Sequence, residues 1–247
     1  MSHAGAGRAI LLAALLAGCR RAEAPGRPDP GPGAAPAAAT PAPAVEQPAA
    51  PPPVTGPPSP MDMNPPPPSA IPREALAYRD RFIRIWRFYF AFAESPTVGF
   101  AQVHQESRWK ADARSVYASG LAQFTPATAA DYSRLLPPEI RAQCSSTAGC
   151  PTDPTWALYA LSLYDYNLHR GYGWAETPDD RWRLALAAYN GGGGWIKKER
   201  VRAENSARWA DIAKACMRSA ASCKENHDYP VVIMERWLPL YQRWLGI

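Results

Sequence analysis

Proline is distributed very unevenly along this chain, and its distribution limits which part can fold. Nineteen of the 28 prolines lie between Pro25 and Pro72, mixed with alanine and glycine and almost no large apolar side chain. Such a segment cannot bury enough surface to offset the entropy lost on ordering, so residues 20–70 are predicted to be a disordered Pro/Ala-rich linker. Fully extended at about 3.1 Å per residue, it would reach on the order of 150 Å. We interpret it as a tether; a PxxP ligand for a partner protein is the alternative.

The first 19 residues have the pattern of an export signal. A weakly basic leader ends at Arg8, and residues 9–17 are apolar throughout, a stretch about half as long as a membrane-spanning helix needs. The sequence Leu16-Ala17-Gly18-Cys19 resembles a bacterial lipobox, in which the cysteine becomes the lipidated first residue of the mature protein. The resemblance predicts a lipoprotein anchored at the periplasmic face of the envelope, since stable anchoring takes more than one acyl chain. The outer membrane is favoured because no aspartate follows Cys19. Secretion with loss of Cys19 is the alternative.

From Ile71 onward the composition is that of a folded domain. All nine tryptophans lie between Trp86 and Trp244, and about 175 residues are enough for one domain with a proper core. We find no alternating strand pattern and no internal repeat, so residues 71–247 are predicted to form a single, mainly α domain. Apolar residues at helical spacing, with arginines between them, predict a core-packing helix early in this domain. Its apolar positions are Phe82, Ile85, Trp86, Tyr89, Phe90 and Ala93.

Helix starts in this domain are marked by a capping residue followed by proline. Four such pairs are Ser95-Pro96, Thr125-Pro126, Asp153-Pro154 and Thr177-Pro178. A further helix is predicted from Ser206 to about Ser219. The last helix is expected to kink at Pro239, because proline cannot supply a backbone N–H.

Four cysteines lie within the predicted domain. An even number in an exported chain predicts disulfides, and four cysteines allow three pairings. The local pairs Cys144–Cys150 and Cys216–Cys223 are favoured because each pair flanks an apparent loop. A zinc site is the alternative, but the cysteine spacings do not suit one. We therefore predict no metal and no cofactor.

Three short motifs point to one chemistry. Glu106-Ser107 closes a predicted helix, Gly120-Leu121-Ala122-Gln123 precedes a Thr-Pro helix start, and residues 187–192 read Ala-Ala-Tyr-Asn-Gly-Gly. Together they resemble the signature of the soluble-type (SLT) lytic transglycosylases, a lysozyme-like family. That family has Glu-Ser, Gly-Leu-Met-Gln and Ala-Tyr-Asn-x-Gly motifs, and the resemblance covers roughly residues 95–196 in the family's order. It implies a lysozyme-like fold and peptidoglycan glycan strands as the substrate.

The chemistry requires a proton donor. Cleaving a glycosidic bond needs a proton on the leaving oxygen as an oxocarbenium-like state forms, and a glutamate in apolar surroundings keeps its proton near neutral pH. Phe100, Val103, Trp109 and Leu121 are expected to provide such surroundings for Glu106. The resemblance implies that this one glutamate acts first as acid and then as base. The acetamido group of N-acetylmuramic acid assists, and the sugar's own 6-hydroxyl closes the ring to a 1,6-anhydro product.

The resemblance also implies substrate-binding roles for five further residues. Ser115 would hydrogen-bond the acetamido group, and Gln123 would line the cleft. Tyr189 and Asn190 would contact Glu106 from the opposite side. For Ser107, a substrate contact and a purely structural hydroxyl remain equal alternatives.

Some positions depart from the family pattern. Ala122 and Thr125 stand where the family has methionines, and the loop before Gly120 is one residue shorter. These changes leave the shape of the subsites, and exolytic or endolytic cleavage, open. Trp109, Tyr117 and Tyr132 are candidates for stacking on sugars, although aromatic residues in a small helical domain more often belong to the core.

Two other functions remain open. A hydrolytic muramidase, like the goose-type lysozymes, would need a second carboxylate, for which Asp112, Asp131 and Asp165 are available. A non-catalytic peptidoglycan-binding lipoprotein would not need Glu106 at all. The formal charge of +5 is only weak evidence for binding an anionic polymer. The chain lacks a concentrated stripe of lysine and arginine, so binding to nucleic acid is not expected. The sequence does not identify a protein partner.

Overall fold

The computed structural model describes residues 67–247. The predicted signal peptide, Cys19 and nearly all of the predicted linker lie outside these residues. Between residues 67 and 247 the chain is mainly helical and contains no β-strand, which confirms the predicted fold class. None of the helices in this part of the chain is both long and apolar enough to span a bilayer.

The helices follow one another with two longer connections, residues 108–125 and residues 143–153. In chain order they are η2 (Pro68–Ala70, a 3₁₀ turn), α1 (Arg73–Phe90), α2 (Thr97–Ser107), α3 (Pro126–Ser133), α4 (Pro138–Ala142), α5 (Pro154–Gly171), α6 (Pro178–Gly191), α7 (Gly193–Arg202), α8 (Trp209–Lys214), α9 (Ala220–Val231), η3 (Val232–Trp237, a π-helical turn) and α10 (Leu238–Leu245).

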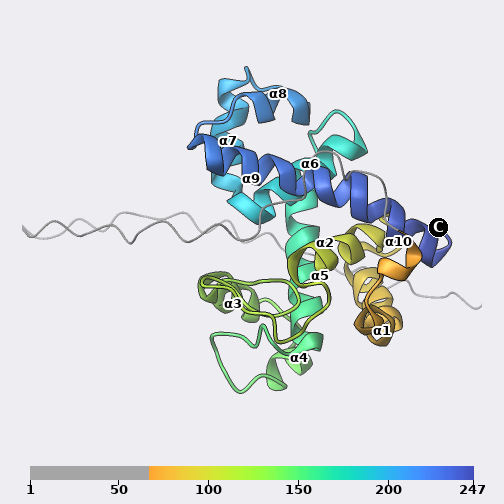
Figure 1. Cartoon of the computed structure of the whole chain (residues 1–247). Helices are drawn as coiled ribbons and strands as arrows, with labels where there is room; N and C mark the ends of the chain where they lie inside the picture. Colours follow the sequence, from red (N-terminus) through yellow and green to blue (C-terminus); the bar gives the residue numbers. More distant parts are fainter. Residues whose placement is uncertain (1–66) are drawn as a thin grey trace, which may run out of the picture. The chain divides into compact units, whose positions relative to one another are not determined.

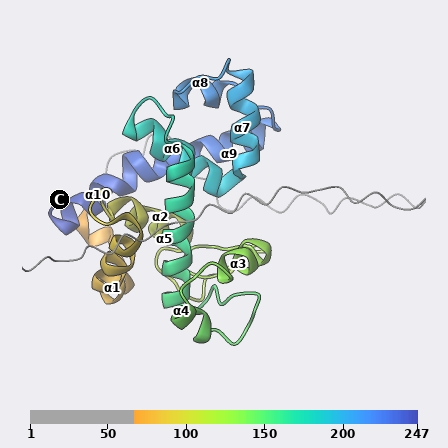
Figure 2. The same cartoon turned by 180° about the vertical axis from the view of Figure 1, so that it is seen from behind.

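Helix α5 runs through the middle of the described part (Figures 1 and 2). Helices α3 and α4 pack at one end of α5, whereas α6, α7, α8 and α9 gather at the other end. The last three elements follow without a break, and we call residues 220–245 the C-terminal rod. The rod packs α9 against α6, and η3 and α10 against α2. It therefore joins the two helices that carry the first and third motifs.

Helix α1 buries most of the predicted apolar face. Phe82, Ile85, Trp86 and Phe90 are buried, and the ring of Trp86 stacks on that of Trp182 at a centroid distance of 6.0 Å. The prediction for Ala93 was wrong. Because α1 ends at Phe90, Ala93 lies beyond the helix and is exposed.

Three of the four predicted helix starts have the expected side-chain cap. Thr125, Asp153 and Thr177 each accept a hydrogen bond from the backbone N–H three residues on, at 3.2, 2.7 and 3.0 Å. Such a cap satisfies one of the N–H groups that a helix start leaves without a partner. Ser95 Oγ accepts the backbone N–H only two residues on, that of Thr97, at 3.3 Å, and it also bonds to the Thr97 hydroxyl at 2.8 Å. Helix α2 begins at Thr97.

The predicted helix from Ser206 to about Ser219 was wrong at both ends. The helix there, α8, covers only Trp209–Lys214. Beyond it the chain turns into the Cys216–Cys223 disulfide, and Ser219 caps α9 by accepting the N–H of Ser222 at 3.2 Å. The structure also contains the Cys144–Cys150 disulfide, so both predicted local pairings are present.

The C-terminal rod changes its helical geometry where a kink was expected. The π-helical turn η3 ends immediately before Leu238-Pro239, and Pro230 lies inside α9 just before η3. Each proline removes a backbone donor from the rod, and a wider turn is one way in which a helix accommodates that loss. This irregular stretch packs directly on α2.

Candidate active site

Glu106 lies in the last turn of α2, a helix that is buried on nearly every side. Val103 and Phe100 are fully buried about one and two turns before it. The helix stops abruptly because Arg108 and Trp109 both adopt the left-handed backbone conformation, with φ of 51° and 66°. Trp109 is fully buried and donates its indole N–H to Tyr241 Oη at 2.7 Å. Trp109 is thus a core anchor for the end of α2, and it is not placed to stack on a sugar.

Glu106 is half-buried, and its carboxyl group has one clear partner. Tyr229, on α9, donates its phenol O–H to Glu106 Oε1. Burial raises the pKa of Glu106 from its ordinary value of 4.5 to about 7, and the hydrogen bond from Tyr229 opposes this rise because it favours the charged carboxylate. A carboxyl with this pKa holds its proton for much of the time at neutral pH and can also give it up.

Tyr229 is the partner of Glu106 that the sequence interpretation missed. It lies 123 residues after Glu106, in the part of the chain to which the motifs assign nothing. The only local signal is a tyrosine beside a proline in the interior of a polar helix. That signal indicates an irregular helix, and it does not indicate a contact with a distant glutamate.

Tyr189, on α6, lies close enough to Glu106 for that carboxyl group to act on its pKa. Its phenol donates to the carbonyl oxygen of Ala122 at 2.7 Å, and its ring lies 4.9 Å from that of Tyr164. Burial, and then the charge of Glu106, raise the pKa of Tyr189 well above 10. Tyr189 is therefore near Glu106, but its hydrogen bond holds the Gly-Leu-Ala-Gln loop instead of the carboxyl group.

The loop between α2 and α3 carries two of the predicted substrate-binding residues. Ser115 is exposed, and its hydroxyl accepts the backbone N–H groups of Ala118 and Tyr117 at 3.0 and 3.4 Å. Gln123 uses its amide NH₂ inside the loop, donating to the carbonyl oxygens of Gly120 and Ala113 at 3.0 and 3.3 Å. Both side chains shape this loop. Their contacts with a substrate remain predictions.

The backbone conformation and the close packing at position 120 explain why the loop has a glycine there. Its φ is +82°, and a Cβ atom there would overlap the carbonyl oxygen of Pro151. Its N–H donates to the carbonyl oxygen of Ala113 at 2.8 Å. The segment that follows the Cys144–Cys150 disulfide, which no motif covers, therefore supports the loop from behind.

Ser107 and Asn190 occupy different surroundings. Ser107 is buried, and its hydroxyl donates to the carbonyl oxygen of Val103 at 3.3 Å. This bond favours a structural role for the hydroxyl. Asn190 is exposed at the end of α6, and its Oδ1 accepts a hydrogen bond from Asn226 Nδ2 at 3.1 Å. Among the described residues, Tyr229 and not Asn190 is the side chain that bonds to Glu106.

The three aspartates considered as a second carboxylate are not equivalent. Asp112 and Asp131 are exposed, and Asp131 pairs with Arg134 at 2.8 Å. Asp165 on α5 is almost completely buried. Burial, and the nearby charge of Glu106, raise the pKa of Asp165 well above its ordinary value. Burial therefore disfavours the charged form of Asp165 that a second carboxylate would have to supply.

Residues 92–212 match the family model of the transglycosylase SLT domain. The chain carries an SLT domain of the lysozyme-like superfamily. This domain indicates an enzyme of the lytic transglycosylase type that acts on peptidoglycan. Comparison with curated proteins finds no match. The matched SLT segment ends within α8, so Tyr229 and the whole C-terminal rod lie beyond it.

Proposed function

We propose that this chain is a peptidoglycan lytic transglycosylase that cleaves the β-1,4 bond between N-acetylmuramic acid and N-acetylglucosamine and leaves a 1,6-anhydro end. The observation that carries the proposal is a single carboxyl group, Glu106, with a pKa raised to about 7 by burial and with a phenol donor on one oxygen. It stands within an SLT domain. A carboxyl of this kind can serve as acid and base in one turnover.

In the proposed reaction, protonated Glu106 gives its proton to the glycosidic oxygen as the bond from that oxygen to the anomeric carbon breaks. The acetamido oxygen of the same sugar stabilises the positive charge at that carbon. The resulting Glu106 carboxylate accepts the hydrogen bond of Tyr229, which favours the charged form. It then takes the proton of the sugar's 6-hydroxyl as O6 bonds to the anomeric carbon. Glu106 is protonated again, and no water is consumed.

The surroundings of Glu106 favour this course over hydrolysis. A hydrolytic glycosidase uses a second carboxylate as nucleophile or to activate water. Among the aspartates of residues 67–247, Asp165 is the one whose pKa responds to Glu106, and its burial disfavours the charged form. An internal hydroxyl of the substrate supplies the nucleophile without that second group.

The mass of the products tests the proposal. The purified protein and its Glu106→Gln variant are incubated with purified peptidoglycan, beside Glu225→Gln, which removes an exposed carboxylate from α9. We expect fragments one water lighter than the hydrolytic fragments from the wild type and Glu225→Gln, and none from Glu106→Gln. Fragments with reducing ends would identify a hydrolase. Binding to the wall without any cleavage would identify a non-catalytic wall protein.

For the N-terminal part, the proposal is a lipid anchor at Cys19 and a Pro/Ala-rich tether that places the enzyme at the periplasmic face of the envelope, most simply on the outer membrane. The lipobox-like Leu16-Ala17-Gly18-Cys19 and the proline content of residues 20–70 support it. Metabolic labelling with a radioactive fatty acid tests it. The wild type should incorporate label and sediment with membranes, and Cys19→Ala should do neither.

A further inference from the structure

Helix α9 brings Tyr229 to Glu106, and a second buried side chain fixes where α9 lies. Asn226 is one turn before Tyr229 on the same face of the helix and is 1% exposed. Its Nδ2 donates to the carbonyl oxygen of Ala187 at 2.7 Å and to Asn190 Oδ1 at 3.1 Å. One amide group thus joins α9 to the end of α6, where the Ala-Tyr-Asn motif lies.

The other end of the Asn226 amide is held by Arg218. The guanidinium of Arg218 donates to Asn226 Oδ1 at 2.5 Å and pairs with Glu199 Oε1 on α7 at 3.2 Å. Glu199 is completely buried, and a buried carboxylate that lost its guanidinium would be costly. A Cβ atom at Gly191 would overlap both Asn226 Nδ2 and Arg218 Nη1. The glycine that follows Asn190 is therefore the residue that lets this network form.

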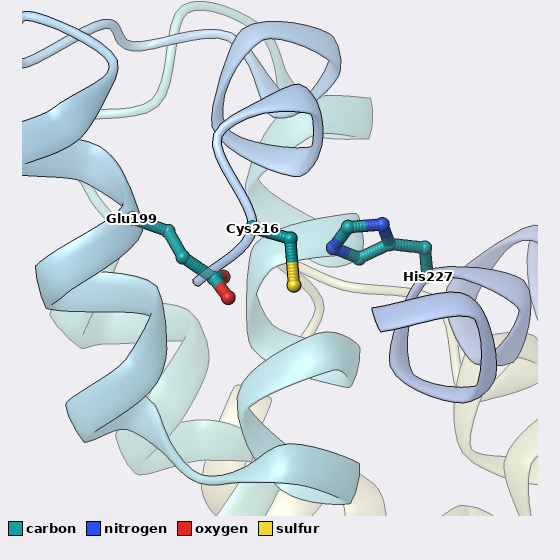
Figure 3. A group of neighbouring side chains, drawn as sticks. All are labelled: Glu199, Cys216 and His227. Atoms are coloured by element: carbon teal, nitrogen blue, oxygen red, sulfur yellow. The ribbon is translucent and has the colours of Figure 1, made fainter. Parts of the chain in front are cut away.

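The Cys216–Cys223 disulfide closes the turn that contains Arg218. Figure 3 shows Glu199 and His227 pointing toward Cys216 from either side, and their potential ligand atoms lie within 4.8 Å of one another. This group does not suit a cation. The sulfur of Cys216 is bonded to Cys223, and the carboxylate of Glu199 is already paired with the guanidinium of Arg218. The cluster is better explained as a clamp that holds the start of α9.

We propose that Asn226 and Arg218 are positioning residues that hold α9 so that the phenol of Tyr229 meets Glu106. Their side-chain bonds go to each other, Ala187, Asn190 and Glu199 and not to Glu106, so they act through Tyr229. The network extends the active site beyond the matched SLT segment, which ends at Ile212. The catalytic importance of this positioning rests on the proposed function. The effect of Asn226 and Arg218 on the contact between Tyr229 and Glu106 can be tested without any catalytic turnover.

The expected effect has a definite sign. The hydrogen bond from Tyr229 lowers the pKa of Glu106 against the rise that burial causes, so a displaced phenol leaves that pKa higher. The other titratable groups coupled to Glu106 are Asp165 of α5 and Tyr189 of α6, and substitution of Asn226 leaves both in place. The charges of Arg108 and of Arg236 on η3 act on His104 and are likewise unchanged.

The experiment is a ¹³C NMR titration of the glutamate side-chain carboxyl groups, with the Glu106 signal assigned by its absence in Glu106→Gln. Tyr229→Phe should raise the titration midpoint of Glu106 by about one pH unit, the size expected for losing one hydrogen bond to a charged group. Asn226→Ala should raise it in the same direction. The double variant should move it no further than Tyr229→Phe alone, because the two side chains act through one contact.

The controls separate positioning from general destabilisation. Glu225→Ala, on the exposed face of α9, should leave the midpoint unchanged. Arg218→Gln keeps the Asn226 side chain and should reproduce part of the Asn226→Ala shift, which provides a second test if Asn226→Ala does not fold. An unchanged Glu106 midpoint in folded Asn226→Ala or Arg218→Gln, or shifts that add fully in the double variant, would overturn the inference.

Product analysis on the same variants keeps the two proposals apart. If the wild type releases no 1,6-anhydro fragments while Asn226→Ala still moves the Glu106 midpoint, the proposed reaction fails and the positioning network stands. If the wild type releases them and the midpoint stays fixed, the reaction stands and the network fails. Where both hold, activity of Asn226→Ala should extend to higher pH than that of the wild type.

Discussion

Replacing Glu106 by glutamine should stabilise the fold, and only above a certain pH. The folded protein keeps the proton of Glu106 up to a pKa of about 7, whereas the unfolded chain loses it near the ordinary value of 4.5. As the pH rises from 4.5 to 7 the unfolded state therefore loses its proton first, and the free energy of unfolding of the wild type falls relative to that of Glu106→Gln. Below pH 4.5 both states hold the proton, and above pH 7 the difference stays constant.

The size of the effect follows from the shift in pKa. Each pKa unit corresponds to about 1.4 kcal/mol, so Glu106→Gln should gain about 3 kcal/mol over the wild type at pH 8 and almost nothing at pH 4. For a domain of this size that is a rise in Tm of about 6–12 °C. The glutamine amide oxygen can still accept the phenol of Tyr229, so the contact itself should persist.

Thermal and urea unfolding of both proteins between pH 4 and pH 8 measures this difference. Glu225→Gln, which removes an exposed carboxylate from α9, is the matched control and should follow the wild type throughout. If the free energies of unfolding of Glu106→Gln and the wild type run parallel from pH 4 to pH 8, the pKa of Glu106 is not raised, and the argument for its role as an acid fails. The loss of activity in Glu106→Gln would then need another cause.

Three other substitutions give independent checks. Gly120→Ala places a methyl group against the carbonyl oxygen of Pro151 at a positive φ, so it should cost about 2–4 kcal/mol in urea unfolding; a cost below 1 kcal/mol would show that the loop has room. Asp165→Asn removes a buried acid whose pKa is raised, so its Tm relative to the wild type should be higher at pH 8 than at pH 4, and an equal difference at both pH values would contradict that burial. Replacing both Cys216 and Cys223 by alanine opens a loop with a sequence separation of 7 and should cost about 2–3 kcal/mol in reversible unfolding. It should also raise the Glu106 midpoint, which NMR titration measures.

The parts of the fold that could be predicted depend on contacts between residues that are close in the sequence. A cap such as Thr177 or Asp153 bonds to an N–H only three residues away, so the sequence alone contains both partners. The same holds for the two local disulfides. Glu106 could also be identified, because its neighbours in the sequence form a recognisable motif.

The contacts that complete the site join residues far apart in the sequence. Tyr229 meets Glu106, and Asn226 meets Asn190, only because the C-terminal rod crosses α2 and α6. No periodicity or cap in residues 220–231 marks either contact. The end of α8 was mispredicted for a related reason, since the disulfide and the Ser219 cap redirect a chain whose composition would allow the helix to continue.

The C-terminal rod also has a consequence for the time at which the enzyme becomes competent. A ribosome completes residues 92–212 before it reaches the rod, so the segment that matches the SLT family is made while Glu106 still lacks its phenol. The same rod supplies Tyr241, which holds Trp109 behind the carboxyl group. A nascent or truncated chain would therefore contain the three motifs and a Glu106 without its phenol partner. If the proposed reaction holds, the enzyme becomes competent only when its last helices have folded.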